Sequence, residues 1–182
     1  MKGLILLADG FEETEALVTI DILRRAKIQI DMISMMSSVF VKGAHQILIE
    51  AESLIDSICY QDYDFLIIPG GSAVLKELKR KDIVYEMIKD FDKKEKVIAA
   101  ICAAPMLIGE ANCLKNRKYI CFKGFENEMY GGEVLSNQNV VIDHHLITAK
   151  SMYYTIDFAL TIIEKLLNKD IALKIQREIM SL

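Results

Sequence analysis

The 182-residue sequence has little that would divide it into parts. It contains only two prolines, and it has no internal repeat, low-complexity segment or linker rich in proline, glycine or serine. Such linkers are the usual mark of a domain boundary. We therefore expect a single domain over residues 1–182, with one well-buried core built from the 52% of residues that are apolar.

A strong charge of either sign is also missing. The chain carries 26 acidic and 22 basic residues, which gives a net charge of −4, and it has no basic stripe. The electrostatic footprint of a nucleic-acid-binding protein is therefore absent. No apolar run approaches the roughly 20 residues that span a bilayer. The opening apolar run is too short for a signal peptide and is followed by acids. These absences predict a soluble protein with neither a nucleic-acid nor a membrane partner.

Cysteine is scarce as well. The four cysteines include no C-x-x-C pair and are too few for a secreted disulfide scaffold, which favours a cytoplasmic location. The three histidines, His45, His144 and His145, form no group with the ligand spacing of a zinc site. The glycine motifs that bind dinucleotides or nucleotide phosphates do not occur. We expect no metal and no cofactor.

What the sequence does have is an alternation of apolar, strand-like runs with segments of helical period. We predict strands at residues 3–8, 28–35, 46–50, 65–68, 97–101, 119–122, 140–142 and 146–149, and helices at residues 12–26, 83–91, 103–111, 153–167 and 171–180. This alternation predicts an α/β fold with a mostly parallel sheet covered by helices on both faces. In such folds ligands bind beyond the carboxyl ends of the strands.

The most informative residue is Cys102, at the point where an apolar strand stops and small residues open a helix. This is the pattern of a nucleophile elbow, in which the neighbours two positions away must be small, as Ala100 and Ala104 are. The following helix would direct its free amides and its dipole at the sulfur and favour the thiolate. The alternative is an inert cysteine buried at the end of a core strand.

Two other segments are expected at the same edge of the sheet. Among the acids that open the first helix, Glu15 precedes an apolar stripe and could point into the cleft, where a protonated carboxyl would donate a hydrogen bond to the thiolate. The alternative for these acids is to complement the helix dipole. The Gly70-Gly71 pair is either a tight turn or, together with the amide of Ala103, an oxyanion hole.

Four ordered motifs together resemble the ThiJ/PfpI superfamily over nearly the whole chain, most of all its DJ-1 branch. They are LADGFEETE at residues 7–15, IDILRRA at 20–26, YDFLIIPGG at 63–71 and AAICAAP at 99–105. The resemblance implies a flavodoxin-like three-layer α/β/α sandwich that forms a homodimer. It also implies that Cys102 is an oxidisable nucleophile, that Glu15 is its protonated partner, and that the amides of Gly71 and Ala103 lie beside the sulfur.

The sequence departs from this family at two places. Phe122 stands where the DJ-1 branch has a histidine near the thiol, which removes a proton shuttle. Residues 150–153, Lys-Ser-Met-Tyr, replace a G-P-G loop that borders the pocket. Gly70 is expected at the pocket rim with Phe122. His45 and Arg25 match polar or basic positions near the pocket, which would give it an anion-attracting rim.

The resemblance implies several functions. The leading one is glyoxalase- or deglycase-like action on small reactive carbonyls or their protein adducts in oxidative stress defence. The rival is a redox sensor or stress chaperone that works through oxidation of Cys102. Cysteine peptidase or amidotransferase activity is a minor alternative. The peptidases have a histidine where this chain has Ala103, and residues 143–146 do not supply the H-x-E of the amidotransferases.

Overall fold

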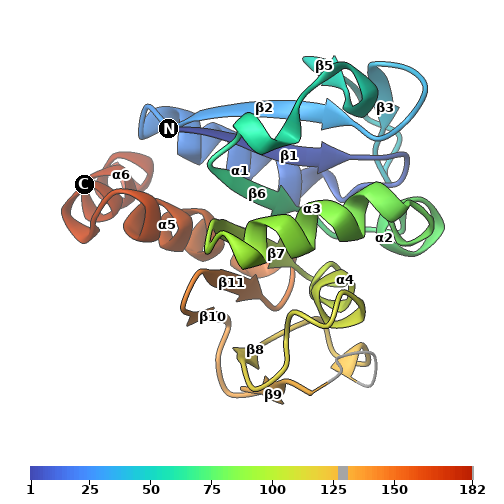
Figure 1. The fold of residues 1–182 in the computed structure, drawn as a ribbon. Helices are drawn as coiled ribbons and strands as arrows, with labels where there is room; N and C mark the ends of the chain where they lie inside the picture. The colour runs from blue at the N-terminus through green and yellow to red at the C-terminus, as the bar shows by residue number, and fades with distance from the viewer. Residues whose placement is uncertain (127–130, 182) are drawn as a thin grey trace.

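In a computed structural model, which describes residues 1–126 and 131–181, the chain forms a three-layer α/β/α sandwich (Figure 1). The strands of the central sheet are β1 (Lys2–Leu7), β2 (Gln29–Ser34), β5 (Ser53–Leu54), β6 (Phe65–Ile68), β7 (Val97–Ile101), β10 (Val140–Asp143) and β11 (Leu146–Ala149). They lie in the order β10-β11-β7-β6-β1-β2-β5. All neighbours pair in parallel except β10 and β11, which are antiparallel.

The central strands lie in the middle of the sheet because they are continuously apolar. Every residue of β6 and β7 is buried, and so is every residue of β1 after Lys2. Parallel strands covered on both faces are expected to be continuously apolar, as these are. The carboxyl ends of β1, β6 and β7, which are adjacent in the sheet, therefore meet at one edge.

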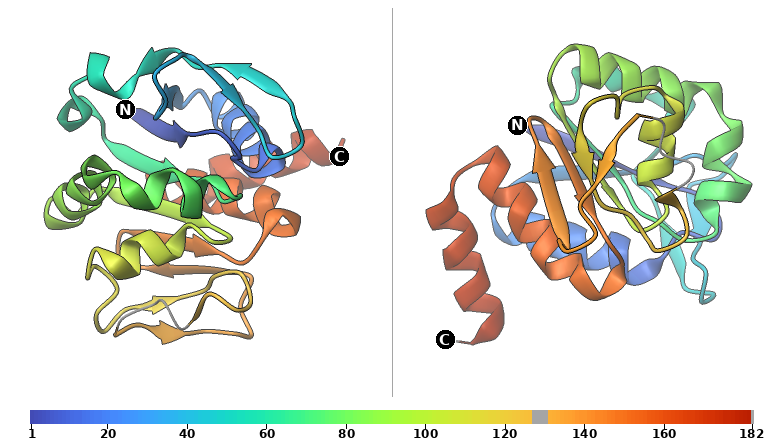
Figure 2. Two further views of the ribbon diagram at one scale, coloured as in Figure 1. Left: turned by 90° about the vertical axis from the view of Figure 1, so that its right-hand side faces the viewer. Right: turned by 90° about the horizontal axis from the view of Figure 1, so that it is seen from below.

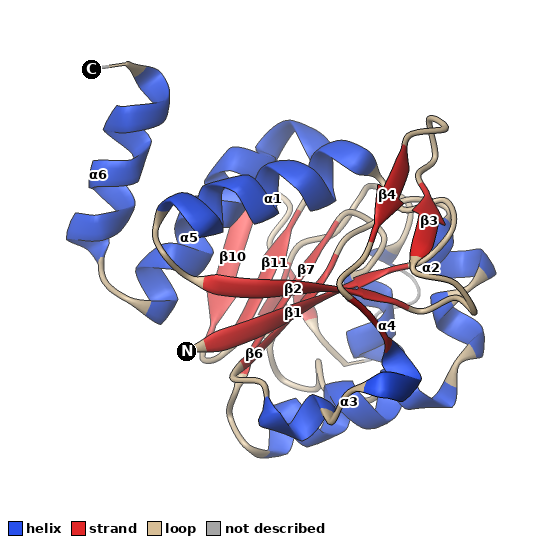
Figure 3. Cartoon of the chain, turned by 90° about the horizontal axis from the view of Figure 1, so that it is seen from above, coloured by secondary structure: helices blue, strands red, loops and turns tan. Residues whose placement is uncertain are grey.

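Helices cover both faces of the sheet. Figure 3 shows α1 (Glu13–Arg25) and α5 (Thr155–Leu166) on one face and α3 (Asp82–Lys93) on the other, with α4 (Pro105–Glu110) and the short α2 (Ala73–Lys76). The last helix, α6 (Lys169–Met180), follows α5 and projects from the sandwich. No helix within residues 1–126 and 131–181 is long and apolar enough to cross a membrane.

Two small sheets lie at opposite ends of the molecule (Figure 2). At one end β3 (Phe40–Lys42) and β4 (Leu48–Glu50) form an antiparallel hairpin. At the other end β8 (Lys118–Tyr119) pairs with β9 (Glu133–Val134). The hairpin lies at the sheet edge where β1, β6 and β7 end, because its turn is hydrogen-bonded to the segment between β1 and α1.

The predicted α/β fold is confirmed, and the predicted bounds of β7 and the residues of β11 agree with the structure. The strand predicted at residues 119–122 is wrong after Tyr119. There the chain turns, because the amide of Ile120 donates to the side chain of Thr148 and the amide of Phe122 donates to the carbonyl of Cys102. The helix predicted from residue 103 begins at Pro105, and β3 and α2 were not predicted.

Candidate active site

Cys102 occupies the turn between β7 and α4, where its φ angle of 64° lies in the left-handed region. A non-glycine residue rarely adopts this conformation, and where it does the strain often marks a functional site. The backbone on both sides is held: the amide of Cys102 donates to the carbonyl of Ala149 (2.9 Å), and its carbonyl accepts from the amide of Phe122 (2.8 Å). The predicted strand–turn–helix geometry of a nucleophile elbow is therefore present, with a half-buried thiol.

Glu15 lies in the first turn of α1 and is 1% exposed. Its Oε2 accepts a hydrogen bond from the amide of Gly70 (2.7 Å). Among the described residues no N–H or O–H group donates to Oε1, and the thiol of Cys102 acts on the carboxyl. Burial raises the pKa of Glu15 to about 7; the charge of Glu12 adds to the rise, while the Gly70 amide and Cys102 oppose it. Near neutral pH Glu15 therefore takes up a proton readily.

The thiol does not behave as the helix dipole alone suggested. Burial raises the pKa of Cys102 to about 12, and the charge of Glu15 and the hydrogen bond to it add to the rise. The amides of Ala103 and Gly71 lower the pKa but do not outweigh these causes. Because α4 has only six residues, its dipole is small. The helix-end amide of Ala103 acts in the predicted direction, but burial and Glu15 outweigh it, so the pKa of the thiol is raised and not lowered.

Cys102 and Glu15 form an interacting pair, because the Glu15 carboxylate opposes ionisation of the thiol and the neutral thiol stabilises the carboxylate. Such a pair has apparent pKa values that belong to both groups, here about 7 and about 12. Between these values the pair holds one proton. When that proton lies on Glu15, the carboxylate charge that opposes the thiolate is gone and the carboxyl becomes a donor. The singly protonated pair therefore includes a thiolate form.

The two glycines after β6 let the backbone reach this pair. A Cβ atom on Gly70 would lie 2.6 Å from Oε2 of Glu15 and 2.7 Å from Cβ of Cys102. Gly71 has a φ angle of 93°, and a Cβ atom there would lie 2.5 Å from the amide nitrogen of Glu12. Neither position has room for a side chain. The amides of Gly71 and Ala103 both lower the pKa of the Cys102 thiol, and their role as an oxyanion hole stays a prediction.

Phe122 lies beside Cys102 through the backbone hydrogen bond between them. Its ring is 44% exposed and meets Phe125 edge to face, with the ring centroids 6.4 Å apart. The altered loop at residues 150–153 starts directly after Ala149, which also holds Cys102. Both departures from the family pattern therefore lie next to the nucleophile, and the Met152 and Tyr153 side chains of the loop are exposed.

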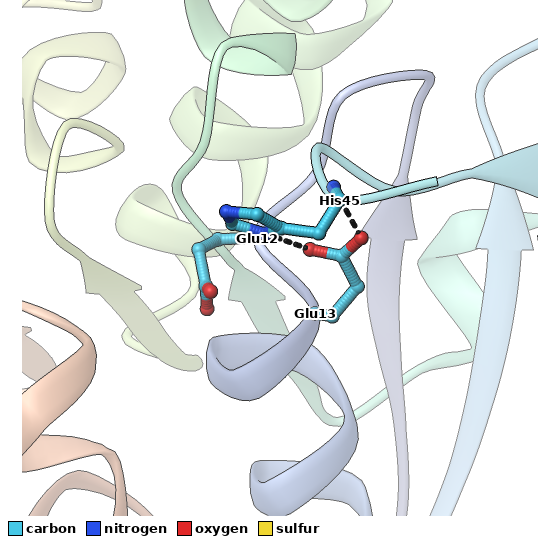
Figure 4. Close-up of side chains that lie close together, drawn as sticks. All are labelled: Glu12, Glu13 and His45. Carbon is cyan, nitrogen blue, oxygen red and sulfur yellow. Dashed lines mark hydrogen bonds and ion pairs between the residues drawn. The ribbon is translucent and has the colours of Figure 1, made fainter. Parts of the chain in front are cut away.

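His45 lies in the β3–β4 turn, where its amide and Nδ1 contact the two carboxylate oxygens of Glu13 at 2.6 and 2.8 Å (Figure 4). Burial works to raise the pKa of Glu13, but the hydrogen bonds from His45 outweigh it and the pKa lies below its ordinary value. The hydrogen bond that His45 donates to Glu13 raises the pKa of the exposed imidazole. A buried carboxylate thus fastens the hairpin to α1, a role that the sequence did not reveal because Glu13 looked like one more acid at a helix start.

Glu12, Glu13 and His45 are the one group of potential metal-ligating side chains in the described chain whose atoms lie within 4.8 Å of one another. Hydrogen bonds explain why these three side chains lie close together. His45 occupies both oxygens of Glu13, and Oε2 of Glu12 accepts from the amide of Glu15.

Arg25 does not lie near this edge within the chain. It is the last residue of α1, at the opposite end of the helix from Glu15, and its guanidinium pairs with Asp21 (2.8 Å). The predicted anion-attracting rim therefore loses Arg25 and retains only His45, whose ring is fastened to Glu13.

Comparisons with known proteins identify the family of this chain. The model of the DJ-1/PfpI family matches residues 1–165. The chain belongs to the DJ-1/PfpI family. It is 31% identical to DJ-1alpha of Drosophila melanogaster, over 97% of this chain and 82% of that protein. It is 31% identical to DJ-1 homolog B of Arabidopsis thaliana, over 96% of this chain but only 40% of that protein's length.

Solved structures give the same result. A DJ-1 superfamily protein of Salmonella typhimurium superposes with a TM-score of 0.90 at 32% identity, covering 99% of this chain and 97% of that one. An oxidized form of Toxoplasma gondii DJ-1 has a TM-score of 0.90 at 29% identity, covering 98% and 97%. These neighbours confirm the flavodoxin-like sandwich for this DJ-1/PfpI family member.

Proposed function

We propose that this DJ-1/PfpI protein acts through Cys102 on small reactive carbonyls or glycated protein adducts, without a cofactor. The observation that carries the proposal is the Cys102–Glu15 pair, in which a buried carboxyl that takes a proton near neutral pH adjoins a strained thiol. A nucleophile and a proton carrier are the two groups that carbonyl addition requires.

The first step follows from the arrangement. The thiolate of Cys102 attacks the aldehyde carbon of an α-oxoaldehyde, a C–S bond forms, and the C=O π electrons move to the oxygen. The amides of Gly71 and Ala103 hold the resulting alkoxide. Glu15 gives its proton to that oxygen, which yields a neutral hemithioacetal and leaves Glu15 as a carboxylate.

Glu15 then serves as a base in the second step. Its carboxylate takes the proton from the hemithioacetal carbon, and the ketone π electrons move to the ketone oxygen, which gives an enediolate. The hydroxyl proton passes to that oxygen, the oxygen it leaves forms a C=O bond, and Glu15 returns its proton to the neighbouring carbon. The product is a thioester of Cys102 with a hydroxy acid, which water hydrolyses. Because Phe122 replaces a histidine, Glu15 must carry these protons alone, so we expect slow turnover.

The test is incubation of the pure protein with methylglyoxal while lactate formation is followed. We expect slow lactate formation by the parent and none by the Cys102→Ser variant. Equal lactate formation by both proteins, or none by the parent at high protein concentration, would rule out this activity.

A second candidate function is redox sensing. The half-buried, strained thiol and the adjacent protonated carboxyl would suit a sulfinate, which Glu15 would hold by a hydrogen bond. Oxidation of the thiol by two molecules of hydrogen peroxide gives a sulfinate and two molecules of water. Mass spectrometry after peroxide treatment should find two added oxygen atoms on the Cys102 peptide of the parent, and fewer with the Glu15→Leu variant.

A further inference from the structure

Glu12, Gly70 and Glu15 form a closed ring of hydrogen bonds beside the thiol. The amide of Glu12 donates to the carbonyl of Gly70 (3.1 Å), and the amide of Gly70 donates to Oε2 of Glu15 (2.7 Å). The amide of Glu15 donates to Oε2 of Glu12 (2.7 Å), which closes the ring. Glu12 therefore contacts the segment that holds the Glu15 carboxyl and also the backbone of Glu15 itself.

Glu12 is an unusual choice for the residue that caps α1. Its side chain accepts the hydrogen bond of an N-cap, yet serine, threonine, aspartate and asparagine are the residues preferred there. A shorter side chain would satisfy the helix end equally well. The need for a cap alone therefore does not explain a glutamate at this position.

The negative charge of Glu12 explains why a glutamate stands at this position. The groups that act on the Glu15 carboxyl are the Gly70 amide, Cys102 and the charge of Glu12. The charge of Glu12 also acts on His45, but that imidazole is hydrogen-bonded to Glu13. A carboxylate at position 12 makes a second negative charge at position 15 unfavourable.

We propose that Glu12 is a positioning residue for the Cys102–Glu15 pair: its cap fixes Glu15 in place, and its negative charge keeps a proton on Glu15. This inference rests on the proposed function, because it takes that pair as the reactive centre. It predicts that loss of the charge transfers the shared proton from Glu15 to the thiol and so removes thiolate.

The test compares rates of Cys102 alkylation by iodoacetamide at pH 5 and pH 8 in the folded protein. Glu12→Gln keeps a side-chain acceptor for the cap but removes the charge. At pH 5 both groups are protonated and the rate depends on the thiol alone, so parent and variant should react equally. At pH 8 the variant should react about three to ten times more slowly, which corresponds to a fall in the pKa of Glu15 of about half to one unit.

Three further variants separate the causes. Glu12→Asp keeps the charge and a favoured cap and should retain the parent rates at both pH values. Glu50→Gln removes an exposed acid on β4 and serves as the matched control for a loss of one charge. Glu15→Gln removes the titrating partner, so its rate should continue to rise with pH where the parent rate is constant.

The outcomes distinguish this inference from the proposed function. A Glu12→Gln rate equal to the parent rate at pH 8, together with an altered Glu15→Gln profile, would overturn the role of Glu12 alone. A Glu12→Asp variant as slow as Glu12→Gln would overturn the role of the charge. A Glu15→Gln profile identical to that of the parent would overturn the reactive pair itself.

Discussion

At the scale of single residues, the site depends on placing two groups that resist ionisation in contact. Cys102 is strained into the left-handed region, and Glu15 is buried with one carboxyl oxygen held by the Gly70 amide. Burial raises the pKa of both groups, and the Glu15 carboxylate raises that of Cys102 further. The consequence is one proton shared between a carboxyl and a thiol near neutral pH, and the stability and the reactivity of the protein should both report that proton.

The first prediction concerns stability. Because the pKa of Glu15 is raised from 4.5 to about 7 in the folded state, its contribution is fully present below pH 4.5 and is lost as the pH rises through 7. Glu15→Gln does not titrate. From pH 5 to pH 8 the parent should therefore lose more unfolding free energy than this variant, by at most roughly 3 kcal/mol.

Urea denaturation at pH 5 and pH 8 measures this change. A difference in unfolding free energy between the two proteins that stays the same at both pH values would show that Glu15 does not hold a raised pKa.

The second prediction concerns Phe122, whose amide donates to the carbonyl of Cys102 and which we expect to stand in place of a histidine. Phe122→His should raise methylglyoxal turnover about tenfold or more if ordinary general acid–base gains apply, because the histidine can share the proton transfers with Glu15. Phe40→His, in the exposed β3–β4 hairpin, is the matched control and should leave turnover at the parent value. Turnover that rises equally in both variants, or in neither, would remove Phe122 as the cause of slow catalysis.

At the scale of structural elements, the turn after β6 brings three parts of the chain together. Gly70 accepts from the segment that opens α1, donates to Glu15 and leaves no space beside Cys102. The β1–α1 segment, the β6 turn and the elbow after β7 are therefore one packed unit. A methyl group at position 70 should disturb all three.

The third prediction is that Gly70→Ala costs about 1–3 kcal/mol of stability and slows Cys102 alkylation, because the new methyl must displace the Glu15 carboxyl or the elbow. Gly124→Ala is the control: its φ angle of 101° makes a methyl there costly to the backbone, but no atom of the described residues lies within 4 Å, so the Cys102 alkylation rate should stay at the parent value. The alkylation rate should therefore separate the two variants. A Gly70→Ala protein as reactive as the parent would show that the turn does not position the pair.

Much of this arrangement could be predicted from the sequence. Continuous apolar runs located β6, β7 and β11, and small residues around Cys102 located the elbow. The hydrogen-bond ring and the Glu13–His45 pair were not predictable, because they join segments far apart in the chain. The direction of the thiol pKa was also missed, since local sequence reports the helix end but not the depth of burial.

At the scale of the whole molecule, the reactive edge and several apolar surfaces are exposed together. Large apolar side chains at the surface include Phe40 and Leu48 of the hairpin, Tyr153 and Ile156 near the start of α5, and Met180 of α6. Apolar surface of this kind, distributed over projecting elements, is typical of a protein that associates with another copy.

The fourth prediction is therefore a homodimer. Sedimentation at micromolar concentration should give a species of twice the 20.6 kDa chain mass. A single species at the mass of one chain would contradict it.

The most direct test of the account is the pH dependence of Cys102 alkylation. In a coupled pair the thiolate fraction becomes constant once one proton has left, so the rate should rise to about pH 7 and then stay level to pH 9. A Cys102 rate that continues to rise through pH 8 and 9 would contradict the shared proton.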